Sequence, residues 1–232
     1  GEGIGLSYLR VPMGASDFAL QNYSYNDLPA GETDPDLLYF SIAHDEGYII
    51  PSLQLARDLN PQLRFMGTPW SPPGWMKNGG TMNGGVLAPQ FYQAFANYHV
   101  RFVQAYADAN LPIDAVTPQN EPMHWNPFYP TMLMLPADQQ AFIRDYLGPA
   151  FRDAGLDTRI LMLDHNWNLT DYVLEVLSDA AAAEYIDGVA FHCYVGDVAS
   201  QSTVHDAHPE KGIWFTECSG GRWATDFGGN LS

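Results

Sequence analysis

The chain has 232 residues, of which 46% are hydrophobic, enough for one domain with a large buried core. Its 27 acidic residues outnumber the 10 lysines and arginines, and the formal charge of −17 opposes binding to nucleic acid or to an anionic membrane surface. No segment approaches the roughly 20 apolar residues of a membrane span, so stable membrane insertion is not expected. The low content of basic residues favours a secreted or periplasmic location and leaves the oligomeric state open.

Six short apolar runs recur along the chain, each followed by a loop with Gly and Pro and then by a helical stretch. The predicted strands are residues 8–12, 63–67, 115–117, 159–163, 189–194 and 213–216. These runs do not alternate cleanly between apolar and polar residues. This pattern is typical of parallel strands that are buried on both faces.

Helical periodicity separates the predicted strands. The clearest helix follows Pro89, where aromatic residues recur every three or four positions on one face. They are Phe91, Phe95, Tyr98, Phe102 and Tyr106. Further helices are predicted to start close to Pro51, near Pro136, and around Thr170, which is a candidate N-cap.

Strand, loop and helix repeated in this order predict a parallel α/β fold, either a closed (β/α)8 TIM barrel or an open doubly wound sheet. The sequence contains no glycine-rich phosphate motif of the kind that would favour the open sheet. Polar side chains end nearly every predicted strand and favour the barrel, whose sites lie at the carboxyl ends of the strands. With six strands instead of eight, we expect an incomplete barrel that lacks its first and last strands, within a longer protein.

The two cysteines, Cys193 and Cys218, are too few for a disulfide scaffold and lack the C-x-x-C spacing of zinc sites. We predict that both are small buried residues. Four other residues that could be considered for a metal site lie near the ends of predicted strands: His124, Asp164, His165 and Trp167. Because no pair among them shows a dedicated ligand spacing, we expect neither a metal site nor a cofactor.

Two glutamates stand at the ends of predicted strands. Glu121 lies in the segment from Thr117 to Pro122, which directly follows the apolar run Ala115-Val116, and Glu217 closes another apolar run. Two carboxyl groups on different strands suit glycoside hydrolysis, in which one protonates the leaving oxygen and the other attacks the anomeric carbon. Taken alone, each could instead be a solvated loop glutamate.

Several segments together resemble glycoside hydrolase family 30, which includes acid β-glucosidase (glucosylceramidase) and endo-β-1,6-glucanases. The matching segments are residues 10–13, 17–18, 69–77, 117–122, 161–164, 191–194 and 215–217. They extend over essentially the whole chain. The resemblance implies that residues 1–232 form a partial catalytic TIM-barrel domain without the β-sandwich domain of that family.

By position, the resemblance implies that Glu121 is the acid/base and Glu217 the nucleophile of a mechanism that retains anomeric configuration. The residues implied to bind the sugar or to hold the nucleophile are Asp17, Trp70, Asn120, Arg10 and Tyr194. His192 should point the same way as Tyr194 from its strand, which makes it a further candidate contact. Tyr129, in the loop after Glu121, is a candidate contact of the acid/base.

Simpler structural roles compete with some of these assignments. Arg10 can form a structural ion pair, which is compatible with holding a carboxylate because a nearby arginine lowers the carboxyl pKa. His192 can be a hydrogen-bonded core histidine, and Trp70 can be a packing anchor in a loop rich in Pro and Gly.

The resemblance leaves the substrate open between two kinds of glycan. The first hypothesis is a β-glucosidase of the glucosylceramidase group that removes terminal β-linked glucose, including glucose from sphingolipids. The alternative is an endo-β-1,6-glucanase, and the catalytic pair does not distinguish a β-glucoside from a β-glucan. A third hypothesis, a non-catalytic carbohydrate-binding protein, is disfavoured because both glutamates are present.

Overall fold

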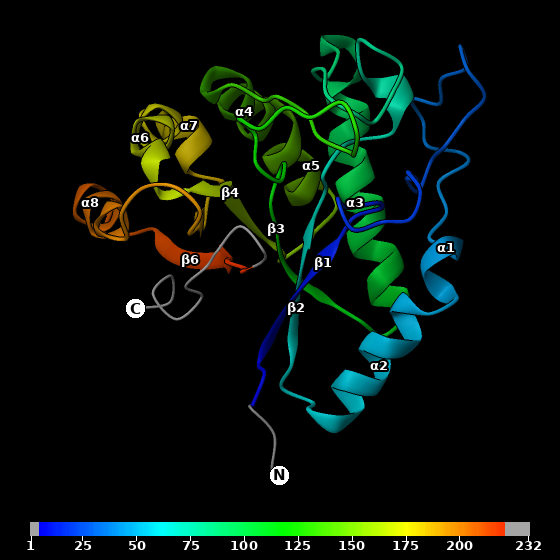
Figure 1. Cartoon of the computed structure of the whole chain (residues 1–232), viewed down its shortest axis with the longest axis horizontal. Coiled ribbons are helices and arrows are strands. Elements are labelled where there is room, and N and C mark those ends of the chain that lie inside the picture. Colours follow the sequence, from blue (N-terminus) through cyan, green and yellow to red (C-terminus); the bar gives the residue numbers. More distant parts are fainter. Residues whose placement is uncertain (1–4, 221–232) are drawn as a thin grey trace.

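The computed structural model describes residues 5–220. Six parallel strands form one sheet in which each strand pairs with the next along the chain. They are β1 (Tyr8–Pro12), β2 (Arg64–Thr68), β3 (Ile113–Val116), β4 (Arg159–Asn166), β5 (Gly188–His192) and β6 (Gly212–Glu217). The sheet curls, and helices cover its outer side (Figure 1). Each predicted strand is present, with bounds shifted by at most a few residues, and the α/β TIM-barrel class is confirmed.

Helices connect successive strands on the outside of the sheet. They are α1 (Ala43–Glu46), α2 (Ile49–Leu59), α3 (Tyr92–Asp108), α4 (Pro136–Phe142), α5 (Gly148–Asp153), α6 (Thr170–Leu177), α7 (Ala180–Ala183) and α8 (Ala199–Ala207). Four other helical turns, in the described part of the chain, accompany them: η1 (Gly74–Met76), η2 (Pro89–Phe91), η3 (Ile143–Leu147) and η4 (Trp167–Leu169). Among the described residues, none of these helices has the length and apolar character needed to cross a membrane.

The aromatic stripe predicted for the segment after Pro89 faces the core. Within α3, Phe95, Tyr98, Phe102 and Tyr106 are completely buried, so the predicted amphipathic helix is confirmed. The prediction that Thr170 is an N-cap is wrong, because Thr170 is the first residue of α6. The turn η4 runs directly into this helix, and the Thr170 hydroxyl donates back to the Trp167 carbonyl oxygen at 3.4 Å.

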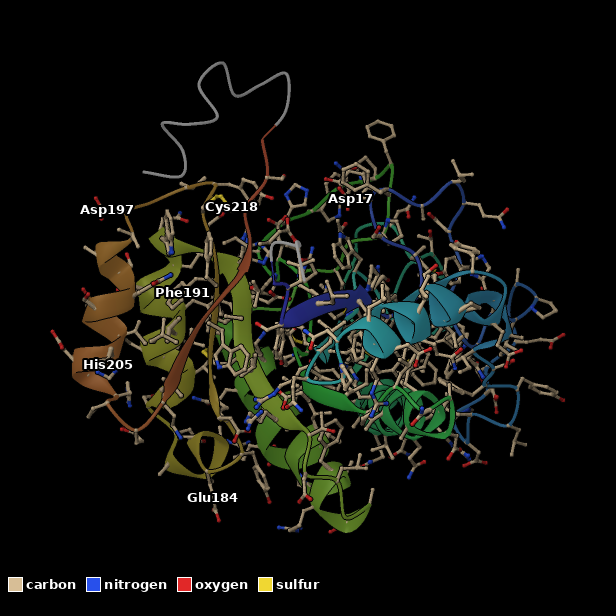
Figure 2. All side chains as sticks on the ribbon, turned by 90° about the horizontal axis from the view of Figure 1, so that it is seen from below. Asp17, Glu184, Phe191, Asp197, His205 and Cys218 are labelled. Carbon is tan, nitrogen blue, oxygen red and sulfur yellow. A yellow bond between two sulfur atoms is a disulfide. The ribbon has the colours of Figure 1, made fainter. Side chains whose placement is uncertain are left out.

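Apolar side chains fill the barrel interior below a polar upper layer. Met66, Ala115, Leu161 and Ala190, from β2 to β5, form a small buried cluster separate from the larger core between sheet and helices. Polar side chains begin where these strands end. Asp17 follows β1 and Cys218 follows β6, and both lie at one end of the molecule, whereas Glu184, which precedes β5, lies at the opposite end (Figure 2).

An irregularity in β4 determines which side chains reach that polar end. Leu163 and Asp164 have φ angles of 69° and 60°, and the register between β4 and β5 shifts between Leu163 and His165. Non-glycine residues seldom adopt this left-handed region, and bulges beside functional sites re-aim side chains. As a result two consecutive side chains lie at the same end of the barrel. Asp164 is buried in the barrel interior, and His165 lines the cavity above Asp164.

Candidate active site

A cavity of about 700 Å³ opens at the carboxyl ends of the strands. Both glutamates identified from the sequence line it, Glu121 just beyond β3 and Glu217 as the last residue of β6. Four other predicted site residues also line it: Asp17, Trp70, Tyr129 and Tyr194. The position agrees with the general rule that parallel α/β barrels form their sites at this end.

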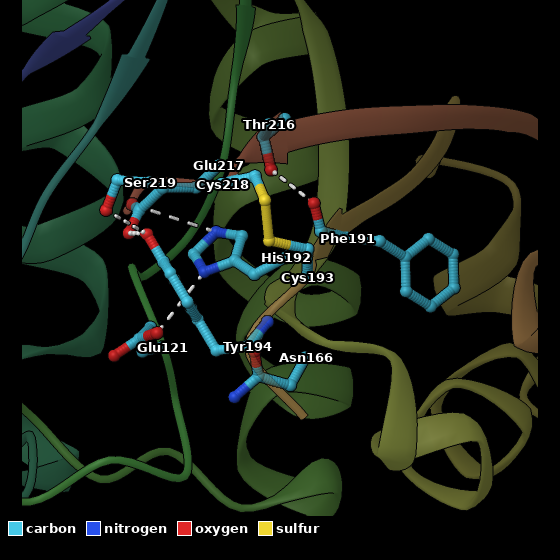
Figure 3. Close-up of a disulfide and its surroundings, with 10 residues drawn as sticks. All are labelled: Glu121, Asn166, Phe191, His192, Cys193, Tyr194, Thr216, Glu217, Cys218 and Ser219. Atoms are coloured by element: carbon cyan, nitrogen blue, oxygen red, sulfur yellow. Dashed lines mark hydrogen bonds and ion pairs between the residues drawn. A yellow bond between two sulfur atoms is a disulfide. The ribbon is translucent and has the colours of Figure 1, made fainter. Parts of the chain in front are cut away.

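Each carboxylate oxygen of Glu217 has its own donor. Arg10 Nη1 donates to Oε2 at 2.6 Å, and the Tyr194 hydroxyl donates to Oε1 at 2.9 Å. Burial raises the pKa of Tyr194 to about 12, and the adjacent Glu217 carboxylate acts in the same direction, so Tyr194 remains a donor at neutral pH. Figure 3 shows Tyr194 and Glu217 side by side at the ends of β5 and β6.

Arg10 links Glu217 to two further side chains. Its Nη2 donates to Asn120 Oδ1 at 2.6 Å and to Asp164 Oδ2 at 2.8 Å. Its guanidinium carbon lies 4.8 Å from the centroid of a Trp70 ring, within the range of a cation–π contact. Arg10 therefore forms a structural ion pair and at the same time orients Glu217, so the two roles considered for it coincide.

Asp164 is the buried centre of this network. Its carboxylate has no solvent exposure and accepts four hydrogen bonds of 2.8 to 2.9 Å from side chains on other strands or just beyond them. The donors are Arg10, Thr117, His192 and Thr216. Burial alone would raise the pKa of Asp164, but the Arg10 charge and the His192 bond hold that pKa well below its usual range.

This role of Asp164 was not predicted from the sequence, where the residue counted only as part of a matching segment and as a rejected metal ligand. The available signal was a lone carboxylate directly after the apolar run Leu161-Met162-Leu163. A charge in that position is expected to be paired inside the fold.

Glu121 stands beside two histidines. Its Oε1 lies 3.3 Å from His192 Nδ1 and 3.7 Å from His165 Nδ1. Burial alone would raise the pKa of Glu121, but the hydrogen bond from His192 and the neighbouring imidazoles lower it below its ordinary value. Glu121 also has a φ of 47°, and its amide donates to the Asp164 carbonyl oxygen at 2.9 Å. The bulged strand β4 therefore fixes the backbone of Glu121.

The pKa values of the two histidines are shifted in opposite directions. Burial lowers the pKa of His165 to about 4, so its imidazole is neutral at pH 7. Burial acts on His192 in the same direction, but its hydrogen bonds to Asp164 and Glu121 raise its pKa above the ordinary value. His192 is thus both a hydrogen-bonded core histidine and a contact of the site.

The remaining predicted residues lie at or next to the cavity. Asn120 is buried and makes its hydrogen bond to Arg10, whereas Asp17 is exposed on the loop after β1. Although the residue as a whole is exposed, its carboxyl is partly desolvated, which raises its pKa, and the nearby Glu217 and Glu121 charges act in the same direction. Tyr129 bonds His124 at 2.9 Å, and within residues 5–220 it makes no hydrogen bond to Glu121.

The prediction for the two cysteines is wrong, because Cys193 and Cys218 form a disulfide and both are only partly buried. His192, the last residue of β5, pairs with Glu217, the last residue of β6. The residues that follow them, Cys193 and Cys218, therefore also lie opposite each other. The two Cα atoms lie 5.3 Å apart, within the range that a disulfide requires. The separation of 25 residues concealed this pairing in the sequence.

Replacing Asp164 with Asn should destabilise the protein strongly. The variant leaves the Arg10 charge without its buried partner, and breaking a buried pair in this way costs about 3 to 5 kcal/mol of unfolding free energy. Since the pKa of Asp164 is lower in the folded than in the unfolded state, its contribution is complete above about pH 4 and lost as the pH falls further. Urea unfolding should therefore show a deficit at pH 7 that shrinks below pH 4.

The control for this experiment is Asp153→Asn. Asp153 pairs with Arg152 at 3.3 Å, and both side chains are largely exposed, so the expected change is within about 0.5 kcal/mol. Equal stability of Asp164→Asn and the wild type at pH 7 would contradict the buried network.

Removing the disulfide should also lower stability. A variant with both Cys193→Ser and Cys218→Ser is expected to lose about 2 to 4 kcal/mol, chiefly because the unfolded chain is no longer constrained. Thermal melting with and without a thiol reductant measures this loss. The reductant should shift the wild type toward the variant and leave the variant unchanged, and a wild-type melting curve insensitive to complete reduction would refute the prediction.

Comparisons with known proteins agree with this geometry. Residues 1–230 match the family described as the glycosyl hydrolase family 30 TIM-barrel domain. An endo-1,6-β-D-glucanase of Aspergillus fumigatus is 34% identical over 97% of this chain and 50% of that protein. The lysosomal acid glucosylceramidase of Mus musculus is 36% identical over 89% of this chain and 42% of that protein.

A solved structure of an endo-β-1,6-glucanase has a TM-score of 0.88 with this chain at 34% identity, covering 96% of this chain and 51% of the other. The chain thus spans about half the length of the proteins it resembles. The family match over nearly every residue, the strand order and the position of the cavity agree. The chain belongs to glycosyl hydrolase family 30, whose TIM-barrel domain it represents.

Proposed function

We propose that the protein containing this chain is a retaining endo-β-1,6-glucanase, with Glu121 as acid/base and Glu217 as nucleophile. The observation that carries the proposal is that two carboxyl groups, from the ends of β3 and β6, line one cavity. Glycoside hydrolysis needs such a pair on either side of the scissile bond.

The environment of Glu217 suits a nucleophile. Arg10 and Tyr194 hold its two oxygens, which fixes the direction of the carboxylate. Both donors are oriented before substrate binds, and such preorganisation lowers the barrier for the reacting group.

The environment of Glu121 suits a residue that alternates between acid and base. Its carboxyl is partly buried beside His192 and His165, and its pKa lies below the ordinary value in the free protein. A sugar that fills the cavity excludes water, and burial of this kind raises the pKa of a carboxyl group. Substrate binding therefore favours the protonated form of Glu121 that the first step needs.

In the first step the Glu217 carboxylate attacks the anomeric carbon and the bond to the leaving glucose oxygen breaks. Glu121 gives its proton to that oxygen, which leaves as a hydroxyl group. In the second step Glu121, now a carboxylate, takes a proton from water, whose oxygen attacks the anomeric carbon and releases Glu217. The two inversions together retain the configuration.

Three further side chains have proposed contacts with the sugar bound next to Glu217. Asp17 and Trp70 line the cavity and are placed to contact its hydroxyl groups. Asn120, held by Arg10 next to Glu121, is the proposed partner of the 2-hydroxyl. Tyr129 lines the same cavity and, through His124, is proposed to limit the movement of the loop after Glu121.

Two observations support an internal β-1,6 linkage over the terminal glucose that was our first hypothesis. The endo-1,6-β-D-glucanases of A. fumigatus and Neurospora crassa are 34% and 38% identical to this chain over at least 93% of its length. In addition Phe18, 89% exposed, lines the cavity, and Phe128 in the loop after Glu121 is 86% exposed. Exposed aromatic faces of this kind suit further sugar rings of a chain.

The linkage is tested by giving the intact protein a soluble β-1,6-glucan and, in parallel, a glucosyl lipid. We expect the β-1,6-glucan to lose chain length quickly and to yield short oligosaccharides, because internal bonds are cleaved. A β-1,3-glucan is the control for linkage. Release of glucose alone, or preference for the glucosyl lipid, would favour the glucosylceramidase alternative.

The two glutamates are distinguished by replacing each with Ala. Glu217→Ala should lower kcat by on the order of 10³-fold or more, since an essential nucleophile is lost. Added azide should partly restore turnover and give a glycosyl azide of inverted configuration. With Glu121→Ala the azide product should keep the original configuration, because Glu217 still forms the intermediate. Proton NMR of the products identifies both, and undiminished turnover by Glu217→Ala would exclude the assignment.

A further inference from the structure

Three atoms capable of binding a metal converge at the wall of the cavity. They belong to Glu121 beyond β3, His165 on β4 and His192 on β5, and they lie within 4.8 Å of one another. Figure 3 shows the Glu121 carboxylate close to the His192 ring. Three adjacent strands therefore deliver one carboxylate and two imidazoles to the same point.

His165 has an unused nitrogen at this point. The residue is 7% exposed, and its Nδ1 is buried without a hydrogen-bond partner within residues 5–220. The nearest acidic atom is Glu121 Oε1, at 3.7 Å. A buried polar atom without a partner is unusual in a folded protein and calls for an explanation. A neutral imidazole in this position offers a lone pair to a cation.

His192 has the orientation of a metal-bound histidine. Its Nε2 is bonded to Asp164 Oδ1 at 2.9 Å, and its Nδ1 is bonded to Glu121 Oε1 at 3.3 Å. A cation bound between Nδ1 and Glu121 would replace the proton of that hydrogen bond, so metal binding releases a proton. Metal-bound histidines almost always donate their other ring nitrogen to a carboxylate or carbonyl group, and this fixes the ring. Asp164 supplies that carboxylate and is itself held by Arg10.

The distances fit a tetrahedral site. With bonds of about 2.1 Å, neighbouring ligand atoms around Zn²⁺ lie about 3.4 Å apart. The two distances from Glu121 Oε1, 3.3 and 3.7 Å, are close to this value. The two imidazole nitrogens stand further apart, within 4.8 Å, so zinc binding requires the His165 ring, whose Nδ1 has no hydrogen bond within residues 5–220, to turn toward His192.

We propose that Glu121, His165 and His192 bind one Zn²⁺ ion, with the fourth coordination position open to the cavity. Two imidazoles and one carboxylate are a ligand set that zinc accepts, whereas Mg²⁺ prefers six oxygen ligands. The negative side chains of Asp17 and Glu217 on the same cavity add to the attraction for a cation.

Zinc in this position inhibits the hydrolase. This consequence depends on the proposed function, because the ion occupies the Glu121 oxygen that must carry a proton to the leaving group. Substrate and zinc then compete for the same cavity, and a chelator that removes the zinc reverses the inhibition. The site is therefore a regulatory one that uses the acid/base itself as a ligand.

Direct binding tests the site without reference to activity. Isothermal titration of the intact, metal-free protein with Zn²⁺ should show one equivalent bound, and Mg²⁺ should not compete. His165→Ala should weaken binding by at least about tenfold, since even the loss of an outer-shell partner has an effect of that size. Co²⁺ in place of zinc should give the visible absorption of a tetrahedral site, and His165→Gln should lose it.

The matched control is His208→Ala. His208 Nδ1 lies 3.5 Å from Glu210 Oε1 outside the cavity, so this variant removes a histidine–carboxylate pair without altering the proposed site. Its zinc affinity should equal that of the wild type, and circular dichroism should show that each variant is folded. Absence of zinc binding, or unchanged affinity in a folded His165→Ala, overturns the proposal.

Hydrolysis of β-1,6-glucan with increasing Zn²⁺ completes the test. Inhibition at the same concentration as binding, reversed by EDTA, supports the regulatory role, and full activity with zinc bound overturns it. A protein that binds zinc through His165 but cleaves no glycoside would retain the metal site and refute the proposed function. A protein that cleaves glucan but binds no zinc would support the proposed function and refute the metal site.

Discussion

The site depends on one buried carboxylate. Asp164 accepts hydrogen bonds from Arg10, Thr117, His192 and Thr216, and these residues lie on β1, just beyond β3, on β5 and on β6. Removing a charge from water is costly, and such a group is tolerated only where its partners satisfy it fully. The four donors meet that condition. As a consequence, strands that are distant in sequence are held in one arrangement at the carboxyl end of the barrel.

The positions of both proposed catalytic groups depend on this carboxylate, through one intermediate side chain each. Arg10 joins Asp164 to Glu217, and His192 joins Asp164 to Glu121. The disulfide next to His192 and Glu217 fastens the same two strand ends covalently. A reacting group must be held to within a fraction of an ångström, and rigid outer partners are the usual means. Asp164 is thus a positioning residue that acts through its neighbours.

The sequence contained enough information for the strands, the main helix and the glutamate pair, because each has a local signal. The aromatic stripe of α3 repeats every three or four residues, Glu121 lies in the short segment after the apolar run Ala115-Val116, and Glu217 closes another run. The bulge in β4, the disulfide and the four bonds to Asp164 have no such signal, since each depends on how separate strands align. The prediction of Thr170 as an N-cap was wrong for a related reason: the turn before α6 leads directly into the helix, and the Thr170 hydroxyl donates to the Trp167 carbonyl oxygen of that turn.

The bulge also explains why Glu121 lies beside both the hydrogen-bond network of Asp164 and the nitrogen of His165 that is unpaired within the described residues. In a regular strand Asp164 and His165 would point to opposite faces of the sheet. The left-handed backbone at Leu163 and Asp164 lets the aspartate reach the barrel interior while His165 reaches the cavity. The first placement orders Arg10 and His192, which contact the two proposed catalytic glutamates. The second leaves an imidazole nitrogen of His165 without a hydrogen bond from the described part of the chain beside Glu121, so the geometry that arranges the proposed acid/base also brings together the proposed ligands of a cation that would block it.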